Sequence, residues 1–251
     1  MKKNFILIVA LVAAGFMQAQ TQFITSGKIE FERRTNVHRL YFSDNDMGSF
    51  GEMMKKSIPQ FRSDFFDLVF TENKTIYKPG KDSDIPKRMG FFGQQPASEN
   101  NVFVDLLNNT GVSQKQVYEK QFLIADSLAK YEWKIQSETR TIAGFECRKA
   151  LTKICDSVVV VAFYTEEIIP GGGPESFHGL PGMILGIAIP RLYTTWFATK
   201  LELTTAVDEN KITAPQKGKK ASMKEMTTTI NAGIKDWGEK YRDRAIWLST
   251  L

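Results

Sequence analysis

The sequence contains few of the side chains from which metal and nucleophilic sites are built. Only two cysteines and two histidines occur among its 251 residues, and neither an HExxH nor a CxxC spacing is present. A zinc site needs three or four such ligands that converge. A set of His38, His178 and Cys147 is geometrically possible across distant strands, but no local spacing supports it. We therefore predict that the protein holds no metal ion and no other cofactor.

The residue pattern of a nucleophilic enzyme is also missing. No Gly-x-Ser-x-Gly elbow occurs, and no set of nucleophile, base and orienting group can be identified. Ser176 and His178 are two residues apart, so in an extended segment they would point to the same side and could form a weak dyad. The sequence favours a non-enzymatic protein. A hydrolase that uses Ser176, His178 or Cys147 is the alternative.

Neither sign of charge is in large excess. The formal net charge is +5, and it falls by two, to +3, without Lys2 and Lys3. This charge is too small and too dispersed to indicate a nucleic-acid partner. Lys217-Gly-Lys-Lys220 is the only tight basic cluster, and its composition is typical of a solvated loop. After the N-terminal segment, no apolar run approaches the roughly 20 residues of a membrane-spanning helix.

The two cysteines are not expected to form a disulfide. Cys147 falls within a predicted strand and Cys155 in the turn after it. Eight residues of strand would separate them by about 26 Å, far beyond the distance that a disulfide can bridge. Unless the chain bends between them, Cys147 is a small core residue.

Residues 1–19 have the three parts of a secretory signal peptide. Lys2 and Lys3 precede a short apolar stretch, and Met17-Gln18-Ala19 forms a cleavage site before Gln20. We expect cleavage after Ala19 and export to the periplasm, the outer membrane or the cell surface. Residues 20–251 contain no repeat or linker that divides them, and are predicted to form one β-rich domain.

Alternating apolar and polar residues predict a mainly β protein. Pro59 ends a short helix near 49–58, residues 79–100 form a long loop, and the capping box of Ser222 and Glu225 begins a helical segment over 222–243. The architecture expected is a single curved antiparallel sheet or an open barrel, like the lipoprotein carriers or the lipocalins. The predicted strands cover 26–33, 64–70, 74–77, 101–107, 116–123, 131–138, 141–152, 157–165, 183–189 and 192–203, and 37–42 continues or returns the first of them.

The predicted strands are organised around the glycine-rich segment 171–187. Leu180-Pro181-Gly182-Met183 predicts a type II turn, because proline presets φ at the second position and glycine supplies the positive φ of the third. Gly179, Pro181 and Gly182 are thus predicted to be structural. The strand 183–189 runs directly out of this turn.

Gly179-Leu-Pro-Gly-Met-Ile184 resembles the signature of the GLPGLI family, with Met183 where leucine is usual. The resemblance is specific from about Phe122 to Leu203. It implies an envelope protein of Gram-negative bacteria, often encoded near TonB-dependent outer-membrane receptors, and it implies no activity. Further pieces that agree in order are Asp126-Ser-Leu, Trp133-Lys-Ile, the run from Glu138 to Cys147, Lys149-Ala150, and the run from Phe163 to Ile168.

These observations favour a binding or structural protein. A curved sheet can hold an apolar small molecule or an extended peptide on its concave face. The alternative is an accessory partner of a TonB-dependent receptor, which would pair with an exposed strand edge. The residues predicted to surround a ligand, each of which can equally be core, are Phe163, Phe177, His178, Leu180, Met183, Ile184, Tyr193 and Trp196.

Overall fold

The computed structural model describes residues 23–42, 48–83, 96–155, 157–203, 207–236 and 238–251. The predicted signal peptide and most of the loop predicted over 79–100 lie outside these residues. Among the helices of the described ranges, none is both long and apolar enough to cross a bilayer.

Twelve strands form one sheet, in the order β12-β6-β5-β4-β3-β2-β1-β11-β10-β9-β8-β7. Its neighbours pair antiparallel except β12, which runs parallel to β6. The end strands β12 and β7 are not neighbours in this order, so the sheet is not a closed barrel. The prediction of a mainly β protein with a single antiparallel sheet is confirmed. The strands are β1 (Gly27–Asn36), β2 (Phe61–Phe70), β3 (Lys74–Pro79), β4 (Asn101–Asp105), β5 (Thr110–Val117), β6 (Lys120–Ser127), β7 (Lys134–Ile142), β8 (Phe145–Ile154), β9 (Val158–Thr165), β10 (Met183–Ile189), β11 (Thr194–Glu202) and β12 (Lys219–Lys220).

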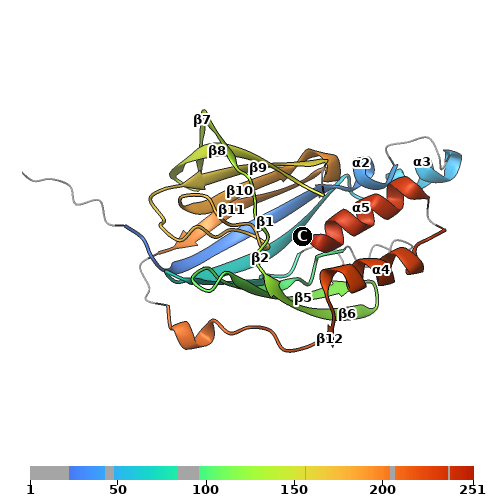
Figure 1. Cartoon of the computed structure of the whole chain (residues 1–251). Helices are drawn as coiled ribbons and strands as arrows, with labels where there is room; N and C mark the ends of the chain where they lie inside the picture. The colour runs from blue at the N-terminus through green and yellow to red at the C-terminus, as the bar shows by residue number, and fades with distance from the viewer. Residues whose placement is uncertain (1–22, 43–47, 84–95, 156, 204–206, 237) are drawn as a thin grey trace, which may run out of the picture.

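The topology requires this sheet to be strongly curved. The chain starts at the centre with β1, moves outward by hairpins to β6, and returns inward from β7 to β11, which pairs with β1. Ten inter-strand steps separate β6 from β7, about 48 Å in a flat sheet. The connection from Ser127 to Lys134 can reach only about 25 Å. The two halves of the sheet must therefore bend toward each other, as Figure 1 shows.

One face of the sheet carries the core, and we call it the inner face. Along β1 the buried side chains alternate, with Ile29 and Phe31 followed by Arg33 and Thr35. The inner-face residues of the other strands join Ile29 and Phe31 in one large hydrophobic cluster. Leu248 from the C-terminal helix belongs to the same cluster. The inner face is thus covered by other parts of the chain.

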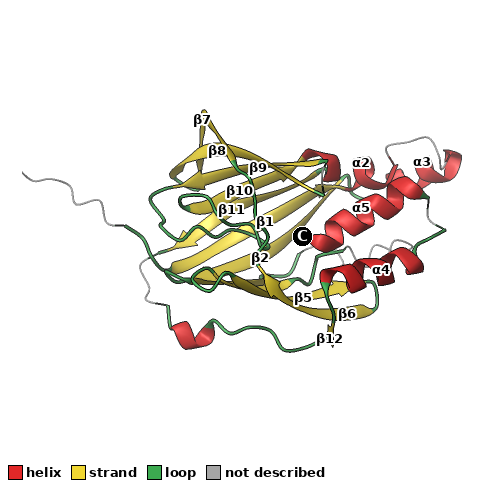
Figure 2. Ribbon diagram, in the orientation of Figure 1, coloured by secondary structure: helices red, strands yellow, loops and turns green. Residues whose placement is uncertain are grey.

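The α-helices of the described residues gather at one side of the sheet (Figure 2). They are α2 (Val37–Phe42), α3 (Gly48–Ser57), α4 (Met223–Gly233) and α5 (Glu239–Thr250). Of the short 3-10 turns, η4 (Pro190–Leu192) joins β10 to β11, and η5 (Glu209–Lys211) lies apart from the α-helices (Figure 1). The predicted helix near 49–58 corresponds to α3. The capping box is confirmed, since Ser222 Oγ accepts from the Glu225 amide and the Glu225 carboxylate accepts from the Ser222 amide.

Several predicted boundaries were wrong. Residues 37–42 form α2 rather than a strand, because Asn36 Oδ1 accepts from the Arg39 amide and caps a helix. The segment 222–243 is two helices, since Gly238 has φ +80 and interrupts it. The basic cluster was expected in a loop, yet Lys219 and Lys220 form β12.

Two predicted strands contain turns. The stretch 116–123 is split after Val117, and Tyr118 has φ +53 in the turn from β5 to β6. The stretch 141–152 is split by Ala143 and Gly144. Both have positive φ, +48 and +92, which is the conformation of a tight hairpin turn.

The glycine-rich turn also differs from its prediction. The Gly182 amide donates to the Leu180 carbonyl at 2.8 Å, which makes a γ-turn centred on Pro181. The Met183 amide donates instead to the Ile168 carbonyl, so the hydrogen bond of a type II turn is not formed. The expected positive φ at Gly182 is present, at +141.

Candidate functional site

Most of the residues predicted to surround a ligand are core residues. Phe163, Phe177, Leu180, Met183, Ile184 and Trp196 are all buried in the large cluster on the inner face. His178 is half-buried and contacts the ring of Tyr131, with 5.3 Å between centroids. Tyr193 is half-buried as well, and it lines a pocket described below.

The residues of the hydrolase alternative are not brought together. Cys147 is fully buried in β8, and burial raises the pKa of its thiol to about 11, which disfavours the reactive thiolate. His178 Nδ1 lies 2.9 Å from the backbone carbonyl oxygen of Ser176, which can only accept a hydrogen bond. The imidazole therefore donates from this nitrogen to its own segment.

The residues of the zinc combination are likewise separated. His38 belongs to α2, and its Nε2 lies 2.8 Å from the backbone carbonyl oxygen of Ile58, the residue that follows α3. Among the described residues, no group of three or more histidine, cysteine, aspartate or glutamate side chains could hold a metal ion.

A mixed polar and aromatic pocket lies between η4 and α5. Its volume is about 550 Å³, within the range of small-molecule sites. Two aromatic side chains, two guanidinium groups and two carboxylates line it: Tyr193, Trp247, Arg191, Arg244, Glu239 and Asp243.

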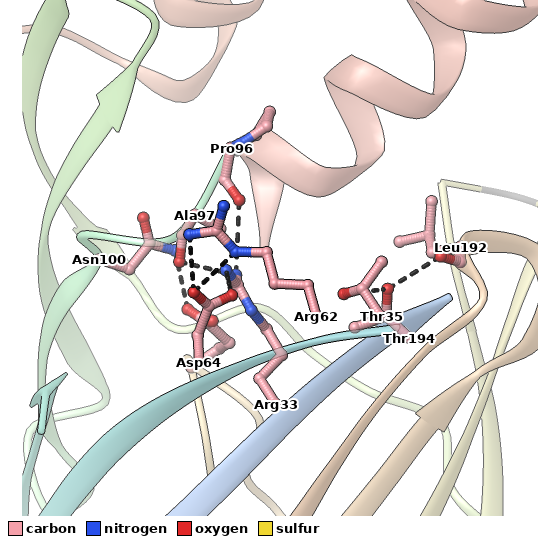
Figure 3. Close-up of polar contacts among 10 residues, drawn as sticks. Arg33, Thr35, Arg62, Asp64, Pro96, Ala97, Asn100, Leu192 and Thr194 are labelled. Carbon is pink, nitrogen blue, oxygen red and sulfur yellow. Dashed lines mark hydrogen bonds and ion pairs between the residues drawn. The ribbon is translucent and has the colours of Figure 1, made fainter. Parts of the chain in front are cut away.

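The local sequence explains how Tyr193 comes to line this pocket. Pro190 starts η4, and the turn ends at Tyr193 with φ +49 and ψ +35, where its amide donates to the Pro190 carbonyl. The left-handed conformation is rare for a bulky residue. Hydrogen bonds fix the next residue: Thr194 Oγ1 donates to the Leu192 carbonyl at 2.8 Å and lies 3.2 Å from Thr35 Oγ1 (Figure 3). Backbone strain of this kind is found at binding sites.

The guanidinium groups of the pocket are held against its aromatic rings. Arg191 Cζ lies 4.8 Å from the centroid of the Trp247 ring, and Arg244 Cζ lies 5.7 Å from that of Tyr193. Arg244 Nη1 also donates to the Leu40 carbonyl of α2 at 2.6 Å. The exposed Arg191 guanidinium can donate its in-plane N–H groups to a ligand while it lies over the indole ring. Together with the carboxylates of Glu239 and Asp243, the pocket offers donors, acceptors and aromatic surface.

A buried ionic network supports the sheet beside this pocket. Asp64 Oδ2 accepts from Arg33 at 2.8 Å and Oδ1 accepts from Arg62 at 2.9 Å (Figure 3). Burial alone would raise the pKa of Asp64, but Arg33 and Arg62 outweigh it and hold that pKa below its ordinary value. Arg33 also donates to the Ala97 carbonyl at 2.8 Å. The network thus fixes the loop at Ala97 onto β1 and β2.

Two further charged side chains are buried on the inner face. Glu175 accepts from Asn100 Nδ2 at 2.8 Å, and burial raises the pKa of its carboxyl although Lys115, Arg33 and Asn100 oppose the shift. Lys115 Nζ donates to the Leu251 carbonyl. Burial lowers the pKa of Lys115 to about 8, and Glu175 acts in the opposite direction. These groups hold the segment around Glu175 and the end of α5 over the sheet.

Sequence reasoning found one residue of the pocket, Tyr193, and missed the rest. Arg191 falls in the gap between the predicted strands 183–189 and 192–203. The residues contributed by α5 were missed because one helical segment over 222–243 was predicted, whereas α5 is a separate helix that begins after Gly238 and extends to Thr250. Trp247 near the C-terminus was the available signal, since an aromatic residue among charges is typical of a binding surface.

Comparison with known proteins identifies a family. Residues 93–227 match the family described as "N-glycanase peptide, N-terminal domain", which is more than half of the chain. No curated protein matches the sequence. The match does not bear on the resemblance to the GLPGLI family, which stays a prediction.

Solved structures of PNGF-II in two crystal forms have a similar fold. The first has a TM-score of 0.51 and 18% identity, and the match covers 78% of this chain and 32% of that one. The second has a TM-score of 0.51 and 16% identity, with 90% of this chain and 33% of that one covered. The chain therefore spans about a third of the length of the PNGF-II chains that it matches. At this identity the likeness shows the fold alone.

Proposed function

The chain belongs to the family of the N-glycanase peptide N-terminal domain, and from this we propose that it is a non-enzymatic, exported domain that binds a glycan. The name of the family supplies the class of ligand, and the pocket between η4 and α5 supplies a place for it.

The composition of that pocket is the observation that carries the proposal. The apolar face of a sugar ring packs well on an aromatic surface, and Trp247 and Tyr193 offer two such surfaces. The hydroxyl groups of a sugar both donate and accept hydrogen bonds. Arg191 supplies donors, and Glu239 and Asp243 supply acceptors. The two cations and two anions balance, which suits a neutral saccharide.

The non-enzymatic part of the proposal rests on the chemistry of the candidate nucleophiles. The raised pKa of Cys147 keeps its thiol protonated near neutral pH. Ser176 and His178 are joined by the backbone contact of His178 Nδ1 rather than by a bond to the serine hydroxyl.

Export rests on the signal segment 1–19, outside the described residues.

Partnership with a TonB-dependent receptor is the second candidate function. The edge strand β7 favours it, because eight of its nine residues are exposed and it lies at the end of the strand order. Such an edge can accept a partner strand. Ser137 lies where the pairing of β7 with β8 shifts register. Ser137→Pro should therefore abolish co-purification with a TonB-dependent receptor and leave the fold intact; co-purification unchanged by it would refute edge pairing.

The glycan proposal is tested by titrating the full chain with a released N-glycan, monitored by calorimetry. Trp247→Ala should weaken binding at least tenfold, because a stacked tryptophan at the centre of a site typically contributes more than about 1.4 kcal/mol. Trp133→Ala is the matched control: Trp133 is also half-buried but lies outside the pocket, so binding should persist.

The outcomes separate the two parts of the proposal. A folded wild-type chain that binds no glycan refutes the function. Glycan binding that Trp247→Ala leaves unchanged refutes the assignment to this pocket.

A further inference from the structure

A second pocket lies near the β12 end of the strand order, between α4 and the turn that joins β5 to β6. Its volume is about 330 Å³. Val117 and Phe122 from the sheet and Ile230 and Ile234 from α4 are buried side chains that line it. These four residues belong to a small hydrophobic cluster separate from the main core. The walls of this pocket are therefore apolar, unlike those of the pocket beside α5.

Gly233 leaves open space at the wall of this pocket. It lines the pocket at the end of α4, and a Cβ added there would meet no heavy atom within 4 Å. Glycine costs a helix about 1 kcal/mol relative to alanine, and no close contact requires it here. The space in front of Gly233 is available to a ligand.

The rim of the pocket is basic. Lys120 lines it, and Lys219 of β12 pairs in register with Phe122, so its side chain leaves the same face of the sheet. Lys220, the next residue, leaves the opposite face, and both lysines of β12 are exposed. Glu119 also lines the pocket, but Lys120 and Lys219 outnumber it. The basic cluster noted in the sequence thus stands beside an apolar pocket.

We propose that this pocket binds a single-chain amphiphile with an anionic head group, such as a fatty-acid carboxylate. The alkyl chain enters between Phe122 and Ile230, and the carboxylate remains at the rim near Lys120 and Lys219. Charge complementarity and an apolar interior select this occupant. The inference goes beyond the glycan proposal and uses none of its residues.

The test measures binding of octanoate, decanoate and dodecanoate, below their micelle concentrations, by displacement of anilinonaphthalene sulfonate from the full chain. Each methylene group added should tighten binding about fourfold while it enters the pocket, the equivalent of about 0.8 kcal/mol per buried CH₂. Affinity that does not depend on chain length would overturn the proposal, and so would no binding at all.

Gly233→Leu should abolish binding, because its side chain occupies the pocket, and it should also preserve or raise the melting temperature. Ala232→Leu places the same side chain at the neighbouring exposed position of α4 and should bind as wild type. Equal binding by both variants contradicts the site.

The head group is tested with Lys120→Gln combined with Lys219→Gln. This change should weaken dodecanoate binding about two- to fivefold, as expected for exposed charges, and leave dodecanol binding unchanged. Vesicles of phosphatidylglycerol distinguish a free amphiphile from a membrane surface. Sedimentation with vesicles in the absence of dodecanoate binding would overturn the proposal in favour of a membrane-binding patch.

Discussion

Lys115 should make the stability of this protein depend on alkaline pH. Its ammonium group is buried on the inner face of β5, and burial lowers its pKa from 10.5 to about 8. A pKa that is depressed in the folded state contributes stability above the unfolded pKa, and this stability is lost as pH falls through the folded pKa. At pH 7 the charged lysine therefore costs the folded state about 3 kcal/mol, from a difference of about 2.5 units at 1.36 kcal/mol each.

The free energy of unfolding should rise between pH 8 and pH 9.5, because the unfolded chain keeps the proton of Lys115 and the folded chain releases it. Linkage gives about 1.5 kcal/mol for this window. Cys147 acts in the opposite direction there, since burial raises the pKa of its thiol to about 11. Comparison with Lys115→Met cancels this contribution, as both proteins contain Cys147.

The assay is urea unfolding of the wild type and Lys115→Met at half-unit steps from pH 7 to pH 9.5. The stability of the variant relative to the wild type should fall by about 1.5 kcal/mol from pH 8 to pH 9.5. Lys120→Met, which removes an exposed lysine of β6, should give a constant difference. If Lys115→Met also gives a constant difference, Lys115 is not buried as a charged group and the reasoning fails.

Two further predictions concern backbone sites. Gly182→Val should destabilise the protein by more than about 3 kcal/mol or prevent folding, because a Cβ there would lie 2.0 Å from the Thr165 carbonyl oxygen. Gly144→Ala is the control. Gly144 also has a positive φ, but a Cβ there would meet no atom within 4 Å, so the substitution should cost only about 1–2 kcal/mol. Wild-type melting of Gly182→Val would contradict the packing of this turn. Ser222→Ala should lower the free energy of unfolding by about 1 kcal/mol through loss of the cap of α4, whereas Thr228→Ala, at an exposed position of the same helix, should change it little in the same urea titration.

The sequence predicted the strands whose polarity alternates and whose turns contain glycine or proline. In β1, Ile29 and Phe31 alternate with charged residues, so one buried face was evident. Two turns were missed, and one of them, at Ala143 and Gly144, contains glycine within a predicted strand. Tyr118 adopts a positive φ that tyrosine rarely takes, so no turn propensity marks its position. The helix α2 begins at the Asn36 cap and is only six residues long, too short for periodicity to distinguish it from a strand.

The candidate pocket could not be predicted in the same way, because it depends on where distant segments meet. Arg191 and Trp247 are 56 positions apart in the chain, yet the guanidinium lies over the indole ring at 4.8 Å. No periodicity within η4 or α5 encodes that contact. It follows from the antiparallel pairing of β10 with β11, which fixes η4 at the rim, and from the Arg244 bond to Leu40, which fixes α5 beside it.

Arg33 shows why a polarity pattern alone mistakes a buried charge for a surface one. Arg33 occupies an inner-face position of β1 and is fully buried. From the sequence alone, an arginine at the end of an alternating strand suggests that the side chain is exposed to solvent. The register of β1 with β2 sets Asp64 opposite Arg33, and the carboxylate supplies the partner that a buried guanidinium requires. A shift of the register by one residue would set Ser63 or Phe65 there and leave the charge unpaired. The ionic pair therefore penalises the wrong register, so Arg33 and Asp64 help to specify this sheet even where their net contribution to stability is small.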